Sequence, residues 1–279
     1  MTIATTAPQS EDRRGAATAE AAARLQGAAE RGVPCAPVRD LIGTSDAALA
    51  YAVQQRRTQA RLAGGARIVG RKIGLTSLAV QRQLKVDRPD FGVLFDDMDV
   101  SSLVVVPYER LLQPKIEAEI AFLLGEDLSS GPFDEPRVRQ SVEFAMPALE
   151  IVDSRISGWD ITFGDTVADN ASSGLFVLGD ARQSLDEFQP VAATMRMYLD
   201  EHLVSEGDGA ACLGDPLIAL AWLAQAALEL GDPLRAGQVV LSGALGPMVA
   251  TPPGARVRAD ISGLGSVHVT LSDDDRSER

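Results

Sequence analysis

Cysteine and histidine are scarce in this sequence, with two of each among 279 residues. Cys35 and Cys212 lie far apart and form no CxxC pattern, which argues against a disulfide scaffold and indicates the reduced thiols of a cytoplasmic protein. His202 and His268 are isolated, so each is expected to be structural or on the surface. A zinc site is disfavoured, because zinc is bound mainly by sulfur and imidazole ligands.

Positive charge is also in short supply. The chain has 26 Lys and Arg against 39 Asp and Glu, a formal net charge of −13. Such a surface repels a phosphate backbone, so no nucleic-acid partner is expected. A small anionic substrate would need a local positive centre, either a metal ion or a cluster of basic side chains.

Long apolar runs are the third absence. No run approaches the roughly 20 residues that span a bilayer, so no membrane partner is expected. The first twenty residues, MTIATTAPQSEDRRGAATAE, lack the apolar core of a secretory signal. We therefore expect a cytoplasmic protein with a disordered lead over residues 1–16 and a disordered tail over 273–279.

Residues 17–66 are expected to form a short helical N-terminal region. The segment 17–31 is rich in Ala, Glu and Arg, which favour a helix. A second helix is predicted over 45–63, with Ser45 or Thr44 as its cap and two glycines at its end.

Residues 67–272 are expected to form a catalytic domain of mixed β structure. Short runs rich in β-forming residues predict strands at 103–107, 116–124, 148–153, 174–179, 193–199, 238–243, 256–262 and 266–271. Helices are expected near 77–84, 135–145 and 216–230, the last opened by Asp215 and Pro216. Because strands do not alternate strictly with helices, the pattern favours an α+β fold with a β-roll or sandwich over a doubly wound sheet.

The main chemical feature is QPKIEAEIAFLL, around a predicted strand. Side chains alternate along a strand, so Glu117 and Glu119 should share one face and Ile116 and Ala118 the other. A third acid, Glu150, lies in the apolar run AMPALEIVDS and should be partly buried.

Two interpretations of these acids are open. They line a solvated strand face, or they form a cation site. Two like charges ~4 Å apart repel by about 4 kcal/mol at an effective dielectric of 20. A third acid at the same place would require a cation or raised carboxyl pKa values. Carboxylates without a nearby histidine suit Mg²⁺ or Mn²⁺.

Three further clusters contain candidate functional residues. Lys72 is flanked by glycines in the apolar stretch VGRKIGLTS, so we expect it to be mostly buried, with its pKa lowered by burial; the alternative is a surface lysine. Asp90 in VDRPDFG is either a turn residue or an acid–base group. The polar run DTVADNASSG, 165–174, is either a plain turn or a loop that faces a ligand.

Together these motifs resemble the 2-oxopent-4-enoate (2-hydroxypenta-2,4-dienoate) hydratases of aromatic meta-cleavage pathways, within the fumarylacetoacetate hydrolase superfamily. The resemblance runs from about Ala36 to Thr270 and rests on GRKIGLTS, VDRPDFG, LQPKIEAEI, PALEIVDSRI, DTVADNASSG, CLGDPLIALAWLA and VVLSGALGPMVA. It implies a β-roll of the fumarylacetoacetate hydrolase C-terminal type. It also implies water addition to 2-hydroxypenta-2,4-dienoate, giving 4-hydroxy-2-oxopentanoate, and assembly as a homo-oligomer, a pentamer or decamer.

The resemblance also assigns residues. It implies that Mg²⁺ or Mn²⁺ is bound by Glu117, Glu119 and Glu150. It also implies catalytic or substrate-binding roles for Lys72 and Asp90. Substrate contacts are implied for the loop residues Asp169, Asn170, Ser172 and Ser173.

Two other functions are weighed beside the hydratase. A 4-oxalocrotonate-type decarboxylase would need a second cationic contact, for which Arg71 and Arg155 are the candidates. A non-catalytic partner subunit would be expected to lose the metal ligands, and all three glutamates are present. Association with a pathway decarboxylase or aldolase fits any of these functions.

Overall fold

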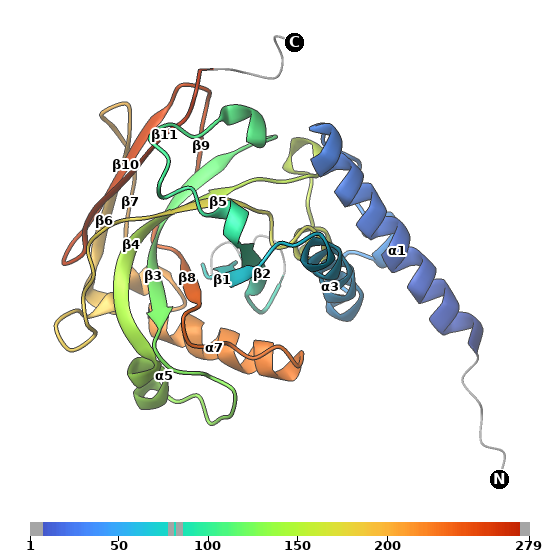
Figure 1. The fold of residues 1–279 in the computed structure, drawn as a ribbon, viewed down its shortest axis with the longest axis horizontal. Coiled ribbons are helices and arrows are strands. Elements are labelled where there is room, and N and C mark those ends of the chain that lie inside the picture. Colours follow the sequence, from blue (N-terminus) through green and yellow to red (C-terminus); the bar gives the residue numbers. More distant parts are fainter. Residues whose placement is uncertain (1–7, 78–80, 82–85, 274–279) are drawn as a thin grey trace.

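The computed structural model describes residues 8–77, 81 and 86–273 (Figure 1). The helices are α1 (Pro8–Arg31), α2 (Arg39–Ile42), α3 (Ala47–Ala63), α5 (Glu135–Ser141), α6 (Phe163–Ala168) and α7 (Pro216–Glu229). The strands are β1 (Ile68–Gly74), β2 (Asp90–Phe95), β3 (Lys115–Leu124), β4 (Val142–Val152), β5 (Ser173–Leu178), β6 (Thr194–Leu199), β7 (His202–Asp208), β8 (Val239–Ala244), β9 (Val249–Ala250), β10 (Arg256–Ile261) and β11 (Gly265–Thr270).

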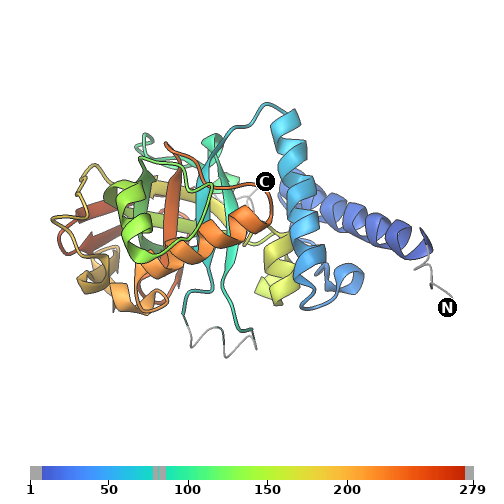
Figure 2. The same cartoon turned by 90° about the horizontal axis from the view of Figure 1, so that it is seen from below.

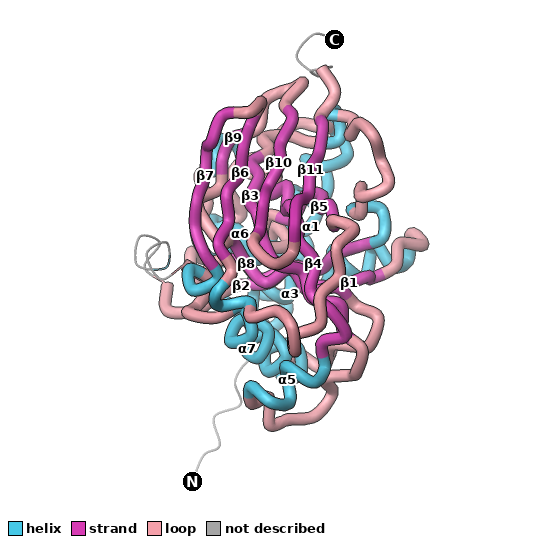
Figure 3. Tube along the Cα trace, turned by 90° about the vertical axis from the view of Figure 1, so that its left-hand side faces the viewer, coloured by secondary structure: helices cyan, strands magenta, loops and turns pink. Residues whose placement is uncertain are grey.

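Two sheets make up the body of the molecule. The larger sheet has the order β2-β1-β8-β3-β4-β5, with β9 paired to β3. Among the strand pairs of this sheet that the structure describes, β1 and β8 run parallel and the others antiparallel. The smaller sheet has the order β11-β10-β6-β7, and Figure 3 shows these four strands side by side. The architecture confirms the predicted α+β fold with a curled, mostly antiparallel β body.

The core lies between the layers. Strand β4 packs against β10 and β11 on one side, and α7 packs against β8 and α5. Large side chains such as Ile120, Phe122, Leu149 and Leu220 are fully buried there. Each such side chain contributes roughly 1.5–3 kcal/mol by leaving water.

Helix α7 begins as its sequence predicts. The Asp215 carboxylate accepts a hydrogen bond from Leu217 N at 2.8 Å, and Pro216 occupies the first turn. The surrounding segment Gly209–Glu229 is 21 residues long and contains an 18-residue window with a mean hydropathy of 1.5. By length and composition alone it could cross a membrane, although no such run was expected. In this fold α7 buries Leu220 and Leu223 in the core, which accounts for its apolar character.

The N-terminal helices stand beside the β body (Figure 2). Helices α1, α3 and α6 share a second apolar core that includes Leu25, Val53 and Val167. Helix α1 begins at Pro8, so residues 8–16 are helical and not part of the predicted disordered lead. The α3 cap is Asp46, which accepts from Leu49 N at 3.0 Å, in place of the predicted Ser45 or Thr44.

Several predicted boundaries differ from the structure. The expected strand 103–107 contributes one bridge, Val106 to Leu271, and Val104 within it is 90% exposed. The helix expected over 135–145 ends at Ser141, since pairing with β3 draws the following residues into β4. Strands β1, β2, β7 and β9 were not predicted. The helix expected near 77–84 and the tail beyond Asp273 lie largely outside the described residues.

Candidate active site and metal centre

Three glutamates meet on neighbouring strands of the larger sheet. Glu117 and Glu119 lie on β3, and Glu150 lies on β4 directly opposite Glu117. Ile116 and Ala118 are buried on the other face of β3, as strand alternation requires. The predicted common face of the two β3 glutamates is confirmed, and the β3–β4 pairing explains why the third acid lies beside them.

The arrangement of these carboxylates fits a single cation. One oxygen from each glutamate lies within 4.8 Å of the other two. Glu119 Oε1 and Glu150 Oε2 are buried without a hydrogen-bond partner. A buried polar atom in that state costs about 1–3 kcal/mol. A hard divalent cation, which prefers oxygen ligands, would satisfy both atoms.

The acids also raise one another's proton affinity. Burial, reinforced by the charge of Glu150, raises the pKa of Glu117 to about 7. Burial, together with the charges of Glu150 and Glu117, raises the pKa of Glu119 well above its usual range. Burial likewise raises the pKa of Glu150, against the opposing charge of Lys72. The three carboxylates therefore hold protons more tightly than free glutamates do, and a cation at the cluster would compete with those protons.

Lys72 lies beside the cluster on β1. Its side chain is 3% exposed, and its Nζ is 3.1 Å from Glu150 Oε1. Burial acts to lower the pKa of Lys72, but the negative charges of Glu150, Asp90 and the β3 glutamates outweigh it and raise that pKa above its usual value. The predicted burial is confirmed, whereas the predicted lowering of the pKa is wrong for these surroundings.

Asp90 reaches the same place from β2. It pairs across the ladder with Gly74 on β1 and is 1% exposed. Its Oδ1 has no hydrogen-bond partner, and burial raises the pKa of its carboxyl despite the charge of Lys72. A Cβ at Gly74 would lie 2.2 Å from Asp90 Oδ1 and 3.4 Å from Lys72 Nζ. The glycine therefore leaves open a space that borders both the acid and the amine.

A cavity of about 610 Å³ opens onto these groups. Its volume suits a small ligand. Lys72, Asp90 and Glu117 line it together with apolar side chains, which include Trp159, Ile161, Leu245 and Met248.

The loop 169–173 faces two ways. Ser172 lines the cavity, and its Oγ lies 3.2 Å from Thr166 Oγ1. The Asn170 side chain instead forms two hydrogen bonds with the Val93 backbone: it accepts from Val93 N at 2.8 Å and donates to Val93 O at 2.9 Å. Ser173 donates to Asn170 O at 2.6 Å. Of these three polar side chains, Ser172 alone is placed for direct substrate contact.

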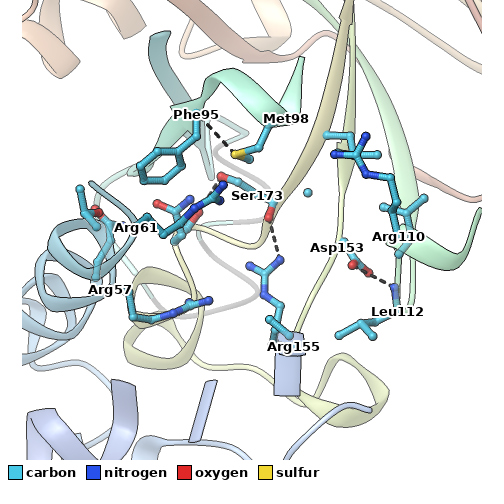
Figure 4. Close-up of a pocket in the computed structure, with 16 residues that line it drawn as sticks. Arg57, Arg61, Phe95, Met98, Arg110, Leu112, Asp153, Arg155 and Ser173 are labelled. Carbon is cyan, nitrogen blue, oxygen red and sulfur yellow. Dashed lines mark hydrogen bonds between the residues drawn. The ribbon is translucent and has the colours of Figure 1, made fainter. Parts of the chain in front are cut away.

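Asp169 is held inside the protein. Arg155 donates to it through Nε at 2.6 Å, and Arg57 through an NH group at 3.1 Å. Figure 4 shows Arg57, Arg155 and Ser173 around a smaller pocket, which shares no lining residue with the cavity. The implied substrate contacts of Asp169, Asn170 and Ser173 therefore find no support here, because their polar groups bind protein atoms.

Neither arginine that could have clamped a second carboxylate turns toward the cavity. Arg71 is 2% exposed and pairs with Asp232, while Arg155 pairs with Asp169. In the described part of the chain, Lys72 is the only Lys or Arg that lines the cavity.

Other residues at the site were not predicted from the sequence, among them Thr166 and Gly243. Thr166 lines the cavity, and Gly243 donates its backbone N–H to Glu119 Oε2 at 2.7 Å. Both lie in motifs that carried the resemblance, DTVADNASSG and VVLSGALGPMVA. Neither residue type signals a role without the fold around it.

Comparison with known proteins agrees with the geometry. Residues 71–272 match the family model described as fumarylacetoacetate hydrolase C-terminal. The chain is 53% identical to 2-keto-4-pentenoate hydratase 2 of Dechloromonas aromatica, covering 88% of this chain and 94% of that one. It is 39% identical to 2-hydroxyhexa-2,4-dienoate hydratase of Comamonas testosteroni, covering 80% and 86%.

A solved structure has the same fold at similar length. The 4-oxalocrotonate decarboxylase of Pseudomonas putida G7, complexed with magnesium and adipate, superposes with a TM-score of 0.88. The two chains are 32% identical, and the match covers 92% of this chain and 98% of that one. The chain therefore belongs to the fumarylacetoacetate hydrolase family, among relatives named as 2-keto-4-pentenoate hydratases.

Proposed function

We propose that this chain is a metal-dependent hydratase. It adds water to 2-hydroxypenta-2,4-dienoate, the enol of 2-keto-4-pentenoate, and gives 4-hydroxy-2-oxopentanoate. The observation that carries the proposal is that three carboxylates lie close enough together to hold one cation, and that one of them, Glu117, lines the same cavity as Lys72 and Asp90. The relatives named as hydratases support this choice of substrate.

The carboxylate cluster defines one end of the site. Glu117, Glu119 and Glu150 would hold Mg²⁺ or Mn²⁺, which supplies Lewis-acid polarisation at the carboxylate and 2-oxygen of the substrate. The apolar side chains of Trp159, Ile161 and other residues suit the hydrocarbon end. The site thus orients a small molecule with one polar and one apolar end.

Lys72 and Asp90 are the groups placed to move protons. As the enol becomes the 2-oxo acid, the 2-hydroxyl loses a proton and carbon 5 gains one. The water that attacks carbon 4 then loses a proton, and carbon 3 gains one. Lys72, whose pKa is raised, is charged at neutral pH and can donate. Asp90, whose Oδ1 has no partner, can accept. Ser172 and Thr166 offer hydroxyls that can hold the water.

A decarboxylase is the second candidate, because the 4-oxalocrotonate decarboxylase shares the fold at 32% identity. Its substrate carries a second carboxylate, and burying such a charge unpaired costs several kcal/mol. Lys72, the one basic side chain that lines the described cavity, is already paired with Glu150. Glu206 and Asp208 also line the cavity and add negative charge. These features favour the hydratase.

The same proposal extends to assembly and location. We place the enzyme in the cytoplasm as a homo-oligomer, a pentamer or decamer, able to associate with a pathway decarboxylase or aldolase. The exposed apolar run of Leu103, Val104 and Val105 supports the assembly, because contacts between subunits cover surfaces of this kind.

A direct assay separates the two activities. Purified protein with Mg²⁺ or Mn²⁺ should consume 2-hydroxypenta-2,4-dienoate, seen as loss of its conjugated ultraviolet absorbance. The product should have the mass of 4-hydroxy-2-oxopentanoate and be cleaved by an aldolase to pyruvate and acetaldehyde. With 4-oxalocrotonate it should release little carbon dioxide. Rapid carbon dioxide release without hydration would replace the hydratase by the decarboxylase.

A further inference from the structure

Strand β8 carries one residue more than its partner next to the metal-binding acids. Ala121 on β3 pairs with Leu241, but Glu119, two residues back along β3, pairs with Ala244, three residues on along β8. The extra residue makes a β-bulge at Ser242 and Gly243. Bulges turn backbone and side-chain groups away from the regular ladder and are frequent beside active sites.

The bulge points an amide at a metal-binding carboxylate. Gly243 N donates to Glu119 Oε2 at 2.7 Å, and both groups are buried. Glu119 Oε1 has no partner. The two oxygens of one carboxylate are thus distinguished: the amide occupies Oε2, and Oε1 is left for a cation.

The backbone at this point requires glycine. Gly243 has a φ of +111°, a conformation that L side chains rarely adopt. A Cβ there would also lie 2.4 Å from Thr76 Cγ2. Thr76 is itself fixed, because its carbonyl accepts from Leu213 N at 3.0 Å.

The other half of the bulge is held from behind. The Cys212 thiol donates to Ser242 O at 2.9 Å, and Cys212 is fully buried. The peptide that links Ser242 to Gly243 is therefore fixed at both ends, by Cys212 on its carbonyl and by Glu119 on its N–H.

We propose that Gly243 is a positioning residue for the metal centre. Its amide fixes the orientation of Glu119, so that this carboxylate binds the cation through Oε1 alone. The inference rests on the proposed metal site and deepens it. Partners that orient metal ligands typically change metal affinity 10–100-fold when they are removed.

A backbone substitution tests this with the least disturbance. Replacing Gly243 by glycolic acid in the full chain turns the amide into an ester, which removes this one N–H and adds no side chain. Mn²⁺ affinity, measured by electron paramagnetic resonance or calorimetry, should fall at least about tenfold.

The matched control is the same glycolic-acid replacement at Gly237, which is not among the residues that line the cavity. Gly237 N donates to Leu124 O at 2.7 Å, so this ester also removes one backbone N–H hydrogen bond between the segment before β8 and β3, but not one to a metal ligand. The Gly237 ester should bind Mn²⁺ as the unmodified chain does.

The outcomes separate this inference from the proposed function. If the unmodified chain binds no Mn²⁺, the metal site itself fails. If it binds Mn²⁺ and the Gly243 ester binds equally well, or if both esters weaken binding alike, Gly243 has no positioning role. A crystal structure with Mn²⁺ gives a second reading that needs no variant: Oε1 of Glu119 alone on the metal supports the inference, and both oxygens on the metal overturn it.

Discussion

At the scale of single residues, the charged groups of the site are held by partners from other parts of the chain. Glu119 on β3 accepts from Gly243 on β8, and Lys72 on β1 pairs with Glu150 on β4. Each of these contacts joins residues that are far apart in sequence. The proton affinities follow from this convergence, since burial and neighbouring charges together determine them.

Replacing the lysine should separate catalysis from metal binding. Lys72→Met is expected to lower turnover at least ~100-fold, the low end of a typical acid–base contribution. Mn²⁺ affinity should hold or rise, because the change removes a positive charge 3.1 Å from Glu150. Steady-state kinetics and calorimetry measure the two effects. Arg67→Met, at an exposed arginine, is the control and should keep both. Near-normal turnover in Lys72→Met would remove the lysine from the mechanism.

The stabilising effect of Mn²⁺ should grow with pH. The pKa of Glu117 is raised from 4.5 to about 7, so its proton stabilises the fold fully below about pH 4.5, and that stability is lost as pH rises through 7. Bound Mn²⁺ replaces the proton and restores the stability that is lost. The Tm difference between samples with Mn²⁺ and with a chelator should therefore be larger at pH 8 than at pH 6. An equal difference at both pH values would contradict the raised pKa.

The residue-scale predictions from sequence succeeded where a local pattern was enough. Alternation along one strand placed Glu117 and Glu119 together, and flanking glycines indicated the burial of Lys72. The direction of the lysine pKa shift was wrong, because it depends on carboxylates from β2, β3 and β4. The polar pattern of the loop 169–173 did not reveal that the side chains of Asp169 and Asn170 bind protein groups outside the loop.

At the scale of elements, the site depends on the order of the strands. Strands β1, β8, β3 and β4 are neighbours in the sheet, so Lys72, the bulge and the three glutamates become adjacent. The sequence predicted β3 and the start of α7 well, because their signals are local. It missed β1 and β2, and misplaced the start of β4, because pairing between distant segments decides them and overrides local propensity.

The cap of α7 can be tested alone. Asp215→Ala removes the carboxylate that accepts from Leu217 N and should cost about 1 kcal/mol of stability. Chemical denaturation monitored by circular dichroism measures the change. The exposed Asp180→Ala is the matched control and should leave the midpoint nearly unchanged. Equal stability of both variants would show that the cap contributes nothing.

At the scale of the whole molecule, charge and shape suit a small anionic ligand. The chain carries a net charge of −13, yet its main cavity brings a lysine beside a cluster of acids that fits a dication. A dication would offset the local negative charge and make the cavity attractive to one carboxylate. The net negative charge was evident from the composition, whereas the position of the cavity could not be predicted from it.

Assembly is also a property of the whole molecule. We expect a homo-oligomer at micromolar concentration, measured by light scattering coupled to size exclusion. Several subunits should elute together as a single species of five or ten chains. A species of 29.5 kDa, the mass of one chain, would contradict the prediction.

The central claim is that one divalent cation, bound by the three glutamates, makes this chain a hydratase. The most direct measurement titrates Mn²⁺ into chelator-treated enzyme while the loss of 2-hydroxypenta-2,4-dienoate absorbance is followed. Activity should rise from near zero and level off at about one equivalent per chain. Glu119→Gln, which keeps the side-chain shape but removes the charge, should show neither binding nor activity. Full hydration by the chelated enzyme, or unchanged Mn²⁺ binding by Glu119→Gln, would contradict the account.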